Sequence, residues 1–145
     1  MPATKDPTSS ASLPPPFIAL AEWVVPGLGY GLLGQRARGL TIGLTIMILF
    51  ALGILIGGVQ VVEAPSLNGS GTIFSQIMQK PWFIGQALTG LPGIVAAMIG
   101  ERTDLPISHA RVNEIGTLYT AVAGMLNLMS IIDSSYRATL PESAS

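Results

Sequence analysis

Residues 40–62 read LTIGLTIMILFALGILIGGVQVV, a run without a single ionisable side chain. A helix rises about 1.5 Å per residue, so this run would extend roughly 34 Å, enough to cross a hydrocarbon core of about 30 Å. The run therefore predicts a membrane-spanning helix, and it decides the class of fold expected for the rest of the chain.

The composition of the whole chain agrees with that expectation. The 145 residues are 49% hydrophobic and 10% charged, with a mean hydropathy of +0.57, whereas a soluble domain carries about 25% charged residues. The net charge of −1 favours neither a nucleic-acid partner nor an acidic one. The absence of cysteine excludes disulfides, thiolate metal sites and cysteine nucleophiles. These properties indicate a membrane protein.

Two further uncharged runs predict additional spans. Residues 82–100 read WFIGQALTGLPGIVAAMIG, where Pro81 suits the start of a helix and Trp82 suits a membrane interface. Residues 115–132 read IGTLYTAVAGMLNLMSII. Each run is about as long as a membrane-spanning helix requires.

The first apolar run, residues 17–33, is shorter and irregular. It reads FIALAEWVVPGLGYGLL, contains Glu22 and is broken by Pro26, so it predicts either a short span or a re-entrant hairpin. The expected fold is an all-α integral membrane helical bundle with about four membrane segments, in one domain over residues 17–133. Residues 1–16 are expected to form a disordered tail, and residues 134–145 a C-terminal tail. No internal repeat is evident in the sequence.

The positive-inside rule predicts an orientation. Loop 34–39 carries two arginines and loop 101–114 carries two more, so both are expected in the cytoplasm. Loop 63–81 and the C-terminus are then expected outside. The N-terminus would lie outside if residues 17–33 span the membrane, and inside if they are re-entrant.

Residues 29–34, GYGLLG, match the G-x-G-x-x-G pattern of a dinucleotide-binding turn. That turn needs an acidic residue about 20 positions further on to bind the ribose, but here that position falls inside the 40–62 run, and the nearest acid downstream is Glu63. We therefore expect no nucleotide at this stretch. The glycines instead indicate a tight hairpin turn, with two arginines as anchors among lipid head groups. The residues of this turn are Gly27, Gly29, Gly31, Gly34, Arg36 and Arg38.

Three stretches together resemble a family of small polytopic bacterial membrane proteins of unknown function. WVVPGLGYGLLGQRARG (23–39) matches the pattern W-x-V-P-G-L-G-x-x-x-x-G-x-x-x-x-G, and it is also similar to two-transmembrane hairpin domains. FIGQALTGLPGIV (83–95) and NEIGTLYTAVAGMLNLMSIID (113–133) resemble the same family. Glu22 and Leu32 depart from the expected residues. The resemblance implies a helical membrane architecture and a bacterial cytoplasmic (inner) membrane location, and it supplies no catalytic residue.

Small residues recur at helical spacing in the predicted helices, which allows helices to approach closely in lipid. Either these faces pack within one bundle, or one of them, centred on Gly53 and Gly57, binds a partner or a second copy of the chain. The candidate packing residues are Gly39, Gly43, Gly53, Gly57, Gly90, Gly93, Gly116, Thr120 and Gly124.

Three polar side chains fall inside the predicted membrane segments. If residue 17 begins outside, Glu22, Gln86 and Asn127 all lie about 6–8 Å from the outer surface by the helix rise. They then form either interhelical hydrogen bonds or a proton or ion site. If the first segment is re-entrant from inside, Glu22 lies in the opposite leaflet.

The sequence contains no metal-ligand or catalytic grouping with a recognised spacing, so we expect no cofactor, no metal and no enzymatic activity. The favoured hypothesis is an accessory or assembly subunit that binds other membrane proteins, or itself, through small-residue helix faces. The alternative is a small transporter or channel component with a polar path near Glu22, Gln86 and Asn127. The expected partners are membrane lipid and other membrane subunits, without nucleic acid.

Overall fold

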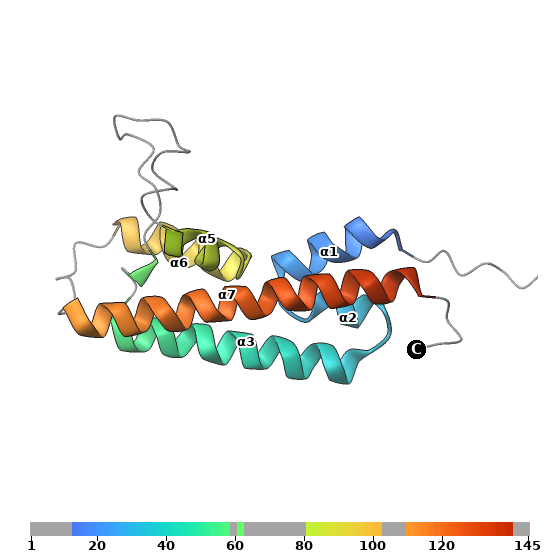
Figure 1. Cartoon of the computed structure of the whole chain (residues 1–145), viewed down its shortest axis with the longest axis horizontal. Helices are drawn as coiled ribbons and strands as arrows, with labels where there is room; N and C mark the ends of the chain where they lie inside the picture. The colour runs from blue at the N-terminus through green and yellow to red at the C-terminus, as the bar shows by residue number, and fades with distance from the viewer. Residues whose placement is uncertain (1–12, 59–60, 63–80, 103–109, 141–145) are drawn as a thin grey trace, which may run out of the picture.

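The computed structural model describes residues 13–58, 61–62, 81–102 and 110–140, and these form a helical bundle (Figure 1). The predicted all-α class is confirmed for this part of the chain. Most of the predicted tail 1–16, loop 63–81 and the segment 103–109 lie outside the described residues. The helices are α1 (Pro15–Val24), α2 (Leu28–Leu32), α3 (Arg36–Gly57), α5 (Pro81–Ala87), α6 (Leu91–Arg102) and α7 (Ala110–Thr139).

The two long helices, α3 and α7, lie side by side and run antiparallel (Figure 1). At one end the backbones of Gly57 and Gly116 meet, since a Cβ atom on Gly116 would lie 2.7 Å from the Gly57 Cα. At the other end Tyr30, just before α3, donates a hydrogen bond to Asp133 near the end of α7. We call these the Gly57 end and the Arg36 end of the bundle.

Within the described part of the chain, α3 and residues 112–139 of α7 are long and apolar enough to cross a membrane. α3 contains no proline, and it stops at Gly58, whose positive φ of 85° breaks the helical pattern. α3 therefore covers residues 36–57 rather than 40–62, and both arginines of the predicted loop 34–39 lie in its exposed first turn.

Residues 17–33 form a half-length hairpin rather than a complete span. α1 starts at the Arg36 end, reaches the middle of the bundle and stops before Pro26, and α2 returns toward the start of α3 (Figure 1). Gly27 makes the turn with a φ of 90°. The chain therefore reverses within these residues, which is the backbone path that the re-entrant alternative requires.

Residues 82–100 also form a hairpin, and the prediction of one complete helix there is wrong. α5 ends at Ala87, Gly90 takes a φ of 81°, and α6 begins at Leu91. A Cβ atom on Gly93 would overlap the carbonyl oxygen of Gln86, seven residues earlier. In a continuous helix these residues would be about 10 Å apart along the axis, so the chain has folded back on itself.

α7 is longer than the predicted segment 115–132, because it continues through Asp133 to Thr139. The predicted C-terminal tail 134–145 therefore begins inside this helix. An ion pair of 2.8 Å between Asp133 and Arg137, one helical turn apart, stabilises the extension.

The order of elements repeats in inverted orientation, although the sequence shows no repeat. A half-length hairpin (α1–α2) precedes a long helix (α3), and a second half-length hairpin (α5–α6) precedes a second long helix (α7). The hairpins enter from opposite ends of the bundle, and their tips meet halfway along α7 (Figure 1). α1 and α5 both lie against α7, whereas α2 lies against α3.

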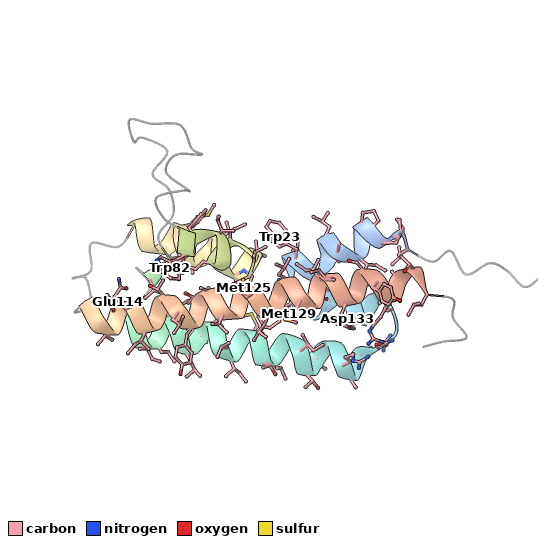
Figure 2. All side chains as sticks on the ribbon, viewed as in Figure 1. Trp23, Trp82, Glu114, Met125, Met129 and Asp133 are labelled. Carbon is pink, nitrogen blue, oxygen red and sulfur yellow. The ribbon has the colours of Figure 1, made fainter. Side chains whose placement is uncertain are left out.

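The antiparallel pairing contradicts one predicted feature of orientation. The start of α3 and the start of α7 lie at opposite ends of the bundle, as Figure 2 shows from the positions of Asp133 and Glu114. If both long helices cross a membrane, loops 34–39 and 101–114 lie on opposite sides of it. In that case the predicted common side of the two loops would be wrong, because residues 82–100 turn back.

Candidate functional site

One buried face of α7 carries most of the polar chemistry of the bundle. Most of its members follow one another at intervals of three or four residues, which places them along one side of the helix. We call this set the polar face of α7, and it consists of Gly116, Thr120, Ala123, Gly124, Asn127, Ser130 and Ser134, all buried.

At the Arg36 end of this face, Glu22 accepts hydrogen bonds from two elements. Its Oε1 accepts from the backbone N–H of Gly27 at 2.9 Å and from the hydroxyl of Ser130, and its Oε2 accepts from the N–H of Gly29 at 2.7 Å. Glu22 is completely buried. One carboxylate therefore holds both the turn between α1 and α2 and the contact of this hairpin with α7.

The same geometry explains the G-x-G-x-x-G pattern. Backbone N–H groups in such a turn can bind a phosphate, but two of those in this turn point at the carboxylate of Glu22. A side chain at Gly29 would contact Glu22 Oε2 at 2.8 Å. The glycines therefore bring the turn onto an acidic side chain of the chain itself.

At the Gly57 end of the polar face, Gln86 connects three segments. Its Nε2 donates to the Val61 carbonyl at 2.8 Å and to Thr120 Oγ1 at 3.0 Å. Gln86 is 1% exposed. The amide thus joins α5, α7 and the segment that follows α3.

Between these two groups, the tips of the hairpins meet. Asn127 Nδ2 donates to the Leu88 carbonyl at 2.9 Å, and Trp23 Nε1 donates to the Ala87 carbonyl at 3.2 Å. Asn127 Oδ1 and Thr89 Oγ1 are buried and have no partner among the described residues.

Glu22, Gln86 and Asn127 do not lie at a common level, which the sequence predicted only for a first segment that spans the membrane. Glu22 bonds to α7 at Ser130, whereas Gln86 bonds to it at Thr120. Ten residues of helix separate these contacts by about 15 Å. The first hairpin enters from the end opposite to the second, so the three side chains form a row along α7.

A second polar cluster at the Arg36 end was not predicted. Tyr30 is buried, and its hydroxyl donates to Asp133 Oδ2 at 2.6 Å, where Arg137 Nε also donates at 2.8 Å. A partial signal was present, because Ser130 and Ser134, which lie on either side of Asp133 in the chain, continue the helical spacing from Asn127. Nothing local indicated the pairing of Tyr30 with a residue 103 positions away.

The candidate packing glycines lie at close backbone contacts within the chain. Gly53 and Gly57 face α7, where added Cβ atoms would meet Thr120 Cγ2 and the Gly116 Cα at 2.7 and 3.1 Å. In this chain α7 therefore covers the face considered for a partner. The other contacts, written glycine to neighbour, are Gly39 to Gly27, Gly43 to Pro26, Gly90 to Trp23, Gly93 to Gln86, and Gly124 to Gly85.

Two turn glycines, Gly31 and Gly34, have no neighbouring atom within 4 Å of an added Cβ. Gly34 nevertheless has a φ of 80°, a conformation that favours glycine. Within the described ranges, no group of three or more His, Cys, Asp or Glu side chains could hold a metal ion.

These features define a class of protein: a helical bundle with two long apolar helices, two opposed half-length hairpins and a buried polar face on the last helix. A family model described as a family of unknown function, DUF6677, matches residues 17–144, and the chain belongs to this family. The expectation of a family without an assigned function is confirmed. No curated protein matches the chain, and no solved structure does.

Proposed function

We propose that the chain is an integral membrane protein with two complete spans, α3 and α7, and two re-entrant hairpins. The exposed surface of the long helices supports this proposal, since Leu55, Met129 and Ile132 are 79%, 69% and 61% exposed. Such a surface suits lipid, whereas the buried residues include Glu22 and Asn127. Polar groups inside and apolar groups outside are the arrangement that a bilayer favours.

For the orientation we propose that the Arg36 end faces the cytoplasm. Among the residues that the structure describes, three arginines lie at this end (Arg36, Arg38 and Arg137) and two lie in helices at the other (Arg102 and Arg111). By the positive-inside rule, the end that carries more arginines faces the cytoplasm. The C-terminus, predicted outside, would then be inside, on the same side as the start of α1.

Cysteine labelling tests this orientation, because the chain has no cysteine of its own. Leu140→Cys and Glu114→Cys place single thiols at exposed positions at opposite ends of α7. A membrane-impermeant maleimide added to intact cells should label Glu114→Cys alone. Labelling of Leu140→Cys alone would reverse the orientation, and labelling of both would contradict two complete spans.

We propose further that the protein is a non-catalytic accessory or assembly subunit of a membrane complex. The observation that carries this proposal is that the hydrogen bonds described above for the Glu22 and Gln86 side chains all join parts of the same chain. These two polar side chains therefore stabilise the fold. The outward faces of α3 and α7 are then the surfaces left for a partner within the membrane. The small-residue faces are already occupied by contacts within the chain.

Co-purification tests the subunit hypothesis. The tagged chain is extracted from its native membrane in a mild detergent, and the proteins that accompany it are identified by mass spectrometry. A stoichiometric partner, lost on Leu55→Arg at the outward face of α3, would support the proposal. Gln35→Arg, near the Arg36 end, is the matched change of charge and should retain the partner. Recovery of the chain alone would contradict the subunit hypothesis.

The second candidate, a small transporter or channel component, has one specific observation in its favour. Two interrupted hairpins of opposite orientation meet at the middle of the bundle, an arrangement found in transporters whose substrate sites lie at helix breaks. Reconstitution into liposomes with sodium, potassium and proton flux assays tests it. Flux above that of empty liposomes, reduced by Asn127→Leu, would support transport, and its absence for all three ions would oppose it.

A further inference from the structure

The middle of the bundle contains two oxygen atoms whose hydrogen bonding is incomplete. They are Thr89 Oγ1 and Asn127 Oδ1, and both residues are 0% exposed. Buried polar atoms in folded proteins nearly always have a partner, and buried water commonly supplies it. Two such atoms at one place therefore indicate a binding site.

The contacts around these atoms bring them together. The Asn127 amide donates to the carbonyl of Leu88, the residue directly before Thr89. Gly124 lies one turn before Asn127 on the same face of α7, and a Cβ atom there would lie 3.0 Å from Thr89 Oγ1. Both oxygens thus lie where the α5–α6 tip contacts α7.

Acceptors outnumber donors at this junction. Asn127 Oδ1 can only accept, and the Trp23 carbonyl, which lies against Gly90, belongs to the last turn of α1, where carbonyls lack a donor within the helix. The occupant must therefore donate hydrogen bonds or carry positive charge. The side-chain oxygens of Glu22 accept hydrogen bonds from Gly27, Gly29 and Ser130, so they are directed at those groups and are not ligands at this junction.

We propose that the junction of the two hairpin tips is a binding site for one water molecule, which bridges Thr89 Oγ1 and Asn127 Oδ1. The water accepts from the Thr89 hydroxyl, donates to Asn127 Oδ1, and retains a second proton for a carbonyl at the end of α1. It links the α5–α6 tip to α7 and α1, much as Glu22 links the other tip. The proposal holds whether the chain is a subunit or a transporter.

The site is tested by whether one substitution lowers or raises the thermal unfolding midpoint. Thr89→Val keeps the shape of the side chain and removes the hydroxyl. With a water bound, the thermal unfolding midpoint in detergent should fall by about 3 °C, because the bridge is lost. Without it, the midpoint should rise, because an unbonded buried hydroxyl has been removed. Thr120→Val removes a buried hydroxyl that accepts from Gln86, and its midpoint should fall in either case.

Two further measurements use the serine variant and the natural chain. Thr89→Ser keeps the hydroxyl and should retain the midpoint, and a fall as large as that of Thr89→Val would overturn the bridge. In the unsubstituted protein, NMR should detect a long-lived water close to the Thr89 amide proton, and no such signal would overturn the proposal. The thermal unfolding midpoint should be equal in sodium, potassium and choline chloride, because a water site does not depend on the cation. A midpoint that differs among these salts would overturn the water proposal and indicate a bound cation.

Discussion

The tips of the two hairpins differ in how their polar groups are bonded. At the α1–α2 tip, one carboxylate accepts from Gly27, Gly29 and Ser130, so a single side chain fixes the turn and its neighbour. At the α5–α6 tip, a hydrogen bond from the Asn127 side-chain amide to the Leu88 carbonyl joins the turn to α7, and one from Trp23 to the Ala87 carbonyl joins it to α1.

At the second tip, close backbone contacts add to these hydrogen bonds. Gly90 lies directly against the Trp23 carbonyl, and Gly124 lies directly against the Gly85 carbonyl. The comparison indicates that one buried carboxylate joins the first tip to α7, whereas the Asn127 amide and close backbone contact join the second tip to it.

The largest predicted effect is on the first tip. Glu22→Ala leaves two backbone N–H groups and the Ser130 hydroxyl without their acceptor, so we expect a loss of about 3 kcal/mol of unfolding free energy. Titration of the folded protein in mixed micelles with sodium dodecyl sulfate, followed by circular dichroism, measures it. Glu114→Gln changes an exposed glutamate on α7 and is the control. Equal stability of the Glu22 variant and the unsubstituted protein would refute the central role of Glu22.

A smaller effect is expected at the second tip. Gly124→Ala places a methyl group on the Gly85 carbonyl oxygen, and the resulting displacement of α5 should cost about 2 kcal/mol. Gly31→Ala adds the same methyl group in open space at a negative φ and should leave stability unchanged or raise it slightly. If the two variants had equal stability in the same titration, backbone fit would not be what holds the α5–α6 hairpin.

The smallest effect concerns the cluster beside the first hairpin. Asp133→Asn removes the ion pair with Arg137 and weakens the bond from Tyr30. The Asp133 side chain is 45% exposed, so solvent screening limits the loss to about 0.5 kcal/mol. Tyr30→Phe, which removes only the hydroxyl, should give a similar value. A loss from Asp133→Asn as large as that from Glu22→Ala would mean that the cluster, and not the carboxylate of α1, fixes the first hairpin.

Much of the candidate site was accessible from the sequence, because small and polar residues at helical spacing identify a packing face. Gln86, Thr120 and Asn127 were found in this way, and they do lie on buried faces. Thr89 and Ser130 were missed as site residues because their importance depends on which segment lies opposite. The hydrogen bond between Ser130 and Glu22 joins residues 108 positions apart.

The sequence by itself determined the helical class, the two long apolar helices and the glycine turn at residues 27–34, since each depends on the local order of apolar, charged and glycine residues. Only the tertiary structure decided that residues 82–100 form a hairpin. A threonine–glycine–leucine–proline step in an uncharged run is compatible with a kinked span or with a reversal. The contacts of Gly90 with Trp23 and of Gly124 with Gly85 accompany the reversal. Those contacts join segments distant in sequence, and the direction of every later segment, including the side on which the chain ends, follows from that reversal.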